Sequence, residues 1–103
     1  MSDSVVLLLQ RLEEELKRQK VWFATPPSPE AMSSTTPFGM DCMAFSQWLQ
    51  WVFIPRVRAI LDHGGALPKG SNMKPYAEEA LKVESLESQH LLVLIEQFDQ
   101  VMS

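Results

Sequence analysis

Apolar positions near the N-terminus recur at spacings of three and four residues, which places them on one face of a helix. From Gln10 onward, charged and amide side chains fill the positions between them. The pattern therefore predicts an amphipathic helix from about Ser4 to Lys20. Its apolar positions are Val5, Leu9, Leu12 and Leu16.

A second helix is predicted from near Asp41 to about His63, and it is apolar nearly all round between Met43 and Ile54. So narrow a polar stripe is typical of the buried central member of a bundle. Pro55 removes one backbone hydrogen-bond donor, which predicts a kink. Gly64-Gly65 then supplies the left-handed residue that ends many helices.

Two further helical stretches are predicted in the C-terminal third, and no segment alternates with period two. Pro75 opens the first stretch, and the apolar phase is lost around Val83–Glu87, where Ser85 can cap a new helix. The last helix is expected from about Leu86 to Met102. The predicted fold class is all-α: a small helical bundle of three to four main helices, in a single domain over residues 1–103.

A long proline-rich loop is predicted from Trp22 to Met40, because its four prolines rule out a long helix or a central strand. Within it, Ser28-Pro29-Glu30 is typical of the start of one helical turn. The loop also carries large apolar side chains that flexible linkers lack, so it is expected to be ordered and to cover the helices, with Pro37-Phe38 near the start of the central helix. Those side chains are Trp22, Phe23, Phe38 and Met40.

Composition narrows the function classes. The chain has 103 residues, 46% of them hydrophobic, and a net charge of −4, which opposes direct binding of nucleic acid. Its single cysteine excludes an internal disulfide, and no segment has the pattern of a signal peptide or a membrane span. A cytoplasmic protein without metal or cofactor is therefore expected, in contact with neither membrane nor nucleic acid.

Between Thr36 and Tyr76 the chain resembles the YqcC-like family of small bacterial proteins, a domain of unknown function. The resemblance is carried by Thr36-Pro37-Phe38, by Met40-Asp41, by the block Trp-Leu-Gln-Trp-Val-Phe-Ile-Pro-Arg over residues 48–56, by Leu67-Pro68 and by Pro75-Tyr76. Trp22, Pro26 and the leucines of both terminal helices fit the same frame. The family implies an all-helical fold and supplies no activity.

The resemblance also implies a possible partner. Genes for such proteins often lie beside one for a tRNA pseudouridine synthase, and some relatives carry that enzyme's name. Such an enzyme resembles a larger α/β domain with a catalytic aspartate above a basic RNA groove, whereas this chain is short and acidic and has no predicted strand. We therefore do not expect it to be the enzyme itself, and physical association with that enzyme is a hypothesis.

Charged side chains on the predicted helices are interpreted as exposed. Glu13 with Lys17 and Glu14 with Arg18 are pairs of opposite charge four residues apart. The acidic runs Glu13-Glu14-Glu15 and Glu78-Glu79 are read as solvated faces. His90, at the edge of the last helix's apolar face, is interpreted as a packing residue.

A candidate binding surface consists of aromatic residues and one arginine: Trp22, Phe38, Trp48, Trp51, Arg56 and Tyr76. Trp48 and Trp51 belong either to the core, where we expect both to be more than half buried, or to a pocket. Arg56 either holds a ligand carboxylate or phosphate or pairs with a carboxylate such as Asp41 or Glu78.

Three hypotheses of function follow. The first is a non-enzymatic protein-interaction module, because the chain is rich in aromatic residues and lacks a recognisable catalytic set. The second is a small-ligand-binding protein with an aromatic pocket around Trp48, Trp51, Arg56 and Tyr76. The third, an enzyme with Cys42 as its nucleophile, is the weakest, because neither histidine is near Cys42 in sequence and a small buried apolar role fits this cysteine better.

Overall fold

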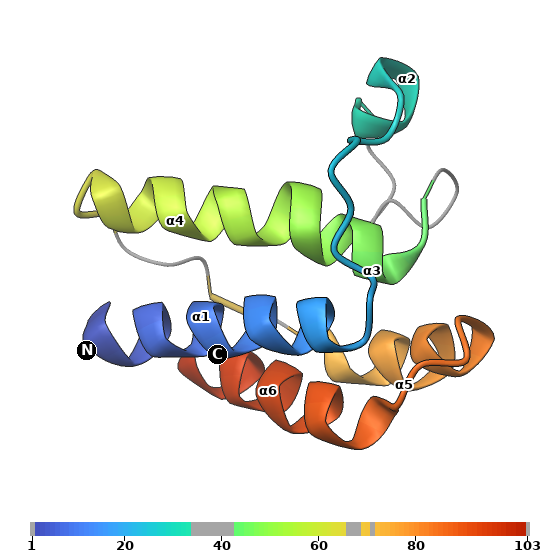
Figure 1. Cartoon of the computed structure of the whole chain (residues 1–103). Coiled ribbons are helices and arrows are strands. Elements are labelled where there is room, and N and C mark those ends of the chain that lie inside the picture. The colour runs from blue at the N-terminus through green and yellow to red at the C-terminus, as the bar shows by residue number, and fades with distance from the viewer. Residues whose placement is uncertain (1, 34–42, 66–68, 71, 103) are drawn as a thin grey trace.

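The computed structural model describes residues 2–33, 43–65, 69–70 and 72–102, which form helices and turns with no strand (Figure 1). This confirms the all-α prediction. The N-terminal helix α1 spans Ser2–Arg18 and a single turn, α2, spans Pro29–Met32. The central helix comprises α3 (Phe45–Trp48), η2 (Leu49–Phe53) and α4 (Ile54–Asp62). The C-terminal pair is α5 (Lys74–Val83) and α6 (Ser88–Val101).

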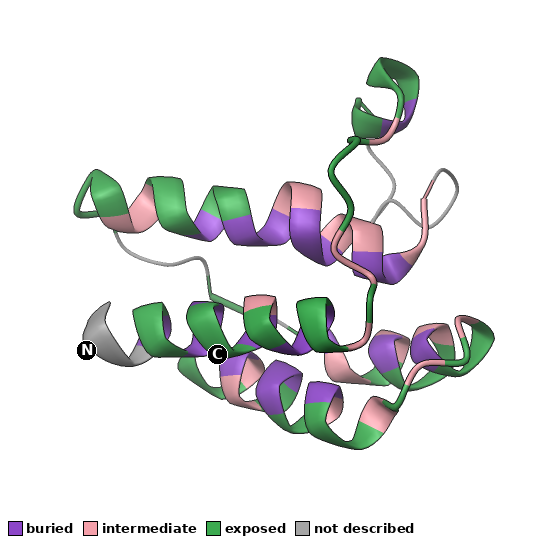
Figure 2. Cartoon of the chain, in the orientation of Figure 1, coloured by how far each residue is buried: buried purple, intermediate pink, exposed green. Residues whose placement is uncertain are grey.

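The apolar faces of the longer helices meet in one core, and Figure 2 marks the buried residues of these helices in purple. Helix α6 packs against both α1 and α5, and α1 also contacts α4. No helix in the described ranges is both long enough and apolar enough to cross a bilayer. The side chains that keep at most 1% of their surface include Leu12, Leu16, Phe45, Leu49, Ile54, Ala77, Leu81, Leu91, Ile95 and Phe98.

Pro55 is accommodated by a widened turn just before it. Over Leu49–Phe53 the helix is a π-helix, and the N–H of Ile54 donates to the carbonyl of Leu49, five residues back. A proline ring collides with the carbonyl four residues earlier in a regular α-helix, and a wider turn relieves that collision. The irregularity that Pro55 predicts is therefore a π-turn within a helix that continues to Asp62.

The break between α5 and α6 confirms the expected loss of helical phase, but Ser85 plays a different part from the one predicted. Ser85 has a φ of 57°. The Leu86 N–H donates to the carbonyl of Leu81 at 3.1 Å, the hydrogen bond that closes a Schellman motif. Ser85 therefore terminates α5, and the residue at the N-cap of α6 is Glu87.

The N-termini of α3 and α6 receive their caps from side chains far away in sequence. The N–H of Ser46, in the first turn of α3, donates to the Glu84 carboxylate at 3.1 Å. At the start of α6, the Glu87 N–H donates to Oε1 of Gln19 at 2.9 Å, and Gln19 Nε2 donates back to the Glu87 carbonyl at 2.9 Å. Since free N–H groups at a helix start need acceptors, these contacts fix how the helices are positioned against one another.

Helix α5 is capped in the same way, by Asp99 of α6. Its carboxylate accepts the N–H of Met73 at 2.9 Å and that of Lys74 at 3.0 Å. We expect Asp99→Ala to lower the free energy of unfolding by about 1–2 kcal/mol, the usual cost of a lost N-terminal cap. Chemical denaturation measures the change. The matched control is Glu96→Ala, which removes only an exposed ion pair to Lys74 and should cost less than about 1 kcal/mol; equal effects would contradict the capping role.

A buried side chain of the central helix, Gln50, binds the backbone of the segment after α1. Gln50 accepts the Phe23 N–H at 3.0 Å through Oε1 and donates to the Phe23 carbonyl at 2.7 Å through Nε2. Ser28 caps α2 by accepting the N–H of Ala31 at 3.2 Å, as its proline-containing turn predicts. The expected packing of Pro37-Phe38 lies outside the described residues.

Candidate functional site

The aromatic residues of the central helix form a row that continues into α5 and α6. The ring of Phe45 stacks on that of Trp48, with 5.8 Å between the ring centroids. It meets the ring of Tyr76 edge-on, with 5.4 Å between the centroids. The ring centroid of Phe53 in turn lies 5.5 Å from that of Trp48. Trp48 and Trp51 are both mostly buried, which confirms their predicted burial. The row is therefore largely core, with Trp48 at its outer edge.

Trp48 and Arg56 lie together at a cavity of about 290 Å³. In a regular α-helix two turns take about 7.2 residues, and a π-turn takes up one more. Residues eight apart across the turn at Leu49–Phe53 therefore share a face. Trp48 and Arg56 have this spacing and both line the cavity.

The cavity has an apolar floor and a polar rim. Its floor consists of the buried side chains Phe53, Val57, Met73 and Met102. Trp48 and Ile60 form walls that are partly exposed, and the exposed residues at its edge are Arg56, Lys69, Gly70 and Asn72. The lining therefore combines an apolar interior with two cations at the opening.

Arg56 makes no ion pair among the described residues. Of the two carboxylates expected to pair with it, Glu78 is exposed and forms no such contact, and Asp41 lies outside the described residues. Arg58, two residues further along α4, does pair: its Nη2 lies 2.7 Å from Glu13. Within the described part of the chain, the Arg56 guanidinium is thus available at the cavity opening.

The other members of the candidate surface lie elsewhere. Tyr76 lines a separate cavity of about 290 Å³ between α3 and α5, where burial, with a smaller contribution from Glu84, raises the pKa of its hydroxyl. Trp51 is not in the described lining of either cavity, and its Nε1 is buried with no hydrogen-bond partner among the described residues. The ring of Trp22 lies 5.3 Å from Lys17 Nζ. Phe38, like Cys42, is outside the described residues.

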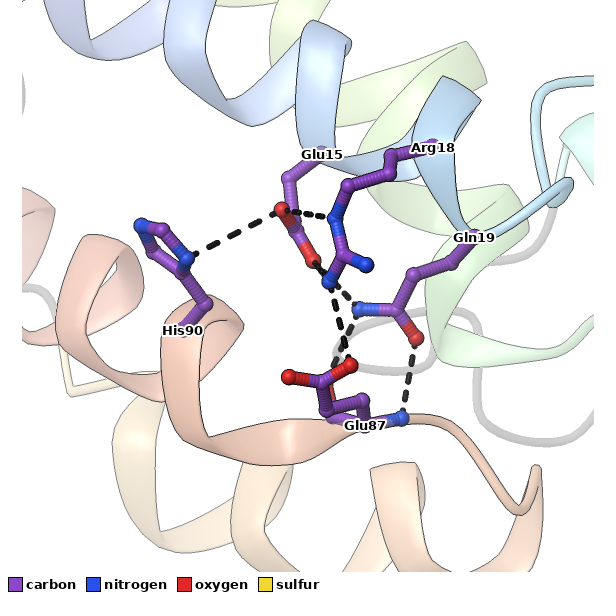
Figure 3. A network of polar contacts seen from close by, with 5 residues as sticks. All are labelled: Glu15, Arg18, Gln19, Glu87 and His90. Carbon is purple, nitrogen blue, oxygen red and sulfur yellow. Dashed lines mark hydrogen bonds and ion pairs between the residues drawn. The ribbon is translucent and has the colours of Figure 1, made fainter.

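A polar network joins the end of α1 to the start of α6 (Figure 3). Glu15 is buried, which overturns the reading of the Glu13-Glu14-Glu15 run as wholly solvated, because α6 packs across that part of α1. Arg18 Nε donates to Glu15 at 2.9 Å and Arg18 Nη2 also reaches Glu87 at 3.2 Å, in place of the expected pair with Glu14. Glu13 and Lys17 do form their predicted pair, at 2.8 Å.

His90 lies at the edge of this network and is exposed, so its interpretation as a packing residue is wrong. Its Nδ1 is 3.9 Å from Glu15, and 67% of its side-chain surface remains accessible. An exposed imidazole at this distance is a weak, screened partner. Across the described residues, no group of three His, Cys, Asp or Glu side chains is arranged to hold a metal ion.

We expect this network to make the free energy of unfolding depend on pH. Hydrogen bonds from Arg18 and then Gln19 lower the pKa of Glu15 below its ordinary value of 4.5. The contribution of Glu15 to the free energy of unfolding is therefore fully present above pH 4.5. It is lost as the pH falls through the lower pKa of the folded state, because the unfolded chain binds more protons in this range.

Unfolding curves recorded from neutral pH down to pH 3 would measure this, and Glu15→Gln should flatten their pH dependence. The control is Glu14→Gln, one residue earlier and exposed. A Glu15→Gln variant with an unchanged acid profile would contradict the assignment.

Comparison with known proteins places the chain in a family. A family model described as tRNA pseudouridine synthase C matches residues 4–101. An uncharacterised protein from Haemophilus influenzae is 45% identical over 84 residues, which cover 82% of this chain and 78% of that protein. A protein named tRNA pseudouridine synthase C from Pectobacterium carotovorum is 47% identical over 58 residues. These residues cover 56% of this chain and only 15% of that protein.

YqcC of Escherichia coli, itself uncharacterised, is 38% identical over 101 residues, which cover 98% of this chain and 93% of YqcC. The solution NMR structure of YqcC superimposes on this chain with a TM-score of 0.83. The superposition covers 97% of this chain and 86% of the YqcC chain in that structure. Matched by the family model almost from end to end, the chain belongs to the DUF446 family of YqcC-like proteins.

Proposed function

We propose that this protein is a non-catalytic helical module that binds a tRNA pseudouridine synthase. The observation that carries the proposal is the similarity to part of a longer protein bearing that name, in which the matched segment is only 15% of the length. In Escherichia coli, by contrast, YqcC is matched over 93% of its length, so there the module is nearly the whole protein. A module found both inside an enzyme chain and by itself is suited to associate with that enzyme, because fusion replaces an encounter by a high local concentration.

The charge of the chain supports binding to the enzyme and opposes binding to RNA. Its net charge is −4, whereas a tRNA-binding groove needs a basic face that displaces counterions from phosphates. Among the described residues the Ser46 hydroxyl does donate to the Glu84 carboxylate, but Ser46 is buried and is not among the residues that line the cavity beside Glu84, so this pair offers no accessible nucleophile. Chemistry and tRNA contacts would then belong to the synthase.

The segment between α1 and α2 is the surface that we assign to this docking. Figure 1 shows it running from the end of α1 past α3 to α2. Gln50 fixes the backbone of Phe23 on both sides, yet 45% of the Phe23 surface is exposed, and Met32 of α2 is 39% exposed. A rigidly presented, exposed aromatic ring is the kind of side chain that dominates binding energy in protein interfaces. Trp22, the preceding residue, belongs to the same surface.

The test uses the full chain and the full-length pseudouridine synthase of the same organism. We expect the two to co-elute in size-exclusion chromatography and to give a saturable binding isotherm by calorimetry. Phe23→Ala should weaken binding by at least about tenfold, as hot-spot truncations do, and leave thermal stability unchanged.

Val83→Ala is the matched control, because Val83 is an apolar side chain that is 85% exposed at the end of α5. Independent elution of the two proteins, with no heat of binding, would overturn the partnership. Binding that Phe23→Ala and Val83→Ala leave equally strong would instead overturn the assigned surface.

A further inference from the structure

We propose that the cavity beside Trp48 and Arg56 binds a small amphipathic carboxylic acid, with its apolar body on the floor and its carboxylate between Arg56 and Lys69. The site is separate from the surface around Phe23. Phe23 and Met32 are not among its described lining residues. The inference therefore stands or falls independently of the synthase.

The size and composition of the floor select the body of the ligand. At about 290 Å³ the cavity is at the lower end of the range for small-molecule sites. Four buried apolar side chains form the floor, and none offers a hydroxyl, amide or charge. A sugar or nucleoside would lose hydration there without gaining hydrogen bonds, whereas a short hydrocarbon or aromatic group would bury apolar surface.

The rim selects the charge of the ligand. Arg56 and Lys69 are the two charged residues in the described lining, and both are cations in a chain whose net charge is −4. Arg56 forms no ion pair among the described residues, so binding an anion would break no such contact there. Its guanidinium offers paired N–H donors whose geometry fits a carboxylate, and Lys69 adds a second positive charge.

The floor of the cavity is also held in place. Met73 lies on its floor, and the Met73 N–H is fixed by Asp99 at 2.9 Å. Phe53, also on the floor, meets Phe98 edge-on at 5.0 Å and belongs to the π-turn, the kind of irregularity often found at functional sites. The apolar floor is therefore preformed, which lowers the cost of ordering on binding.

The experiment is a titration of the full chain, labelled with ¹³C at its methionine methyl groups, with octanoate. We expect the signals of Met73 and Met102 to shift saturably, while that of Met32, which is exposed on α2, stays in place. Octanamide and octylamine have the same body without the negative charge and should bind at least about tenfold more weakly.

Arg56→Gln and Lys69→Gln should each weaken octanoate binding by about tenfold. Arg58→Gln, the same change two residues along the helix, should leave it unchanged, because Arg58 pairs with Glu13 and does not line the cavity. The proposal is overturned if Met73 and Met102 do not shift, or if all methionines shift alike. It is equally overturned if octanamide binds as well as octanoate, or if Arg56→Gln behaves like Arg58→Gln.

Discussion

Replacing Phe98 by alanine should lower the free energy of unfolding by about 3–5 kcal/mol, which is much of the stability of a small domain. Phe98 of α6 has no exposed surface, and its ring meets Phe53 at an interplanar angle of 89°. The substitution removes the buried apolar area, the edge-to-face contact and the volume that holds α6 against the central helix.

Urea or guanidinium unfolding followed by circular dichroism measures this loss. Val93→Ala is the matched control, since Val93 lies on the same helix with half of its surface exposed, and it should change stability by less than about 0.5 kcal/mol. A loss of less than about 1 kcal/mol for Phe98→Ala would place the main core elsewhere.

The helices and the core could be predicted from the sequence because their signal is local. The spacing of Val5, Leu12 and Leu16 follows from the period of one helix, and all three are buried as predicted. Pro55 likewise announces an irregular turn, although chain periodicity alone does not distinguish a kink from a π-turn.

The long-range polar contacts could not be predicted in this way. Gln19, Glu84 and Asp99 each resemble ordinary surface residues, and their roles as caps depend on which helix end lies beside them. The burial of Glu15 has the same origin, because it is set by the packing of α6 across α1. Such contacts are properties of tertiary arrangement, not of sequence pattern.

The candidate cavity could be predicted from the sequence only in part. Residue type alone marks Trp48 and Arg56 as candidates, but the π-turn that aligns them is visible only in the structure. Lys69, Met73 and Met102 come from other parts of the chain, and no spacing rule joins them to the central helix. Trp51 and Tyr76 share the residue chemistry expected of the pocket but face other surroundings.

Gln50→Leu should cost about 2–3 kcal/mol, although leucine is similar in size and more apolar. Gln50 is buried, and its amide satisfies both backbone groups of Phe23, at 3.0 and 2.7 Å. Leucine would leave that N–H and carbonyl without partners against the helix, and the penalty for unpaired polar groups exceeds the gain from apolar burial. The segment from Val21 to Ser33 should then detach locally before the helices unfold.

Hydrogen exchange separates this local effect from global destabilisation. In Gln50→Leu the Phe23 amide should exchange much faster, while amides in the middle of α1 and α6 keep their order of protection. Gln89→Leu makes the same chemical change at an exposed position of α6 and should alter neither stability nor exchange by a measurable amount. Continued protection of the Phe23 amide in Gln50→Leu would mean that other contacts hold this segment, and that Phe23 owes its fixed position to them.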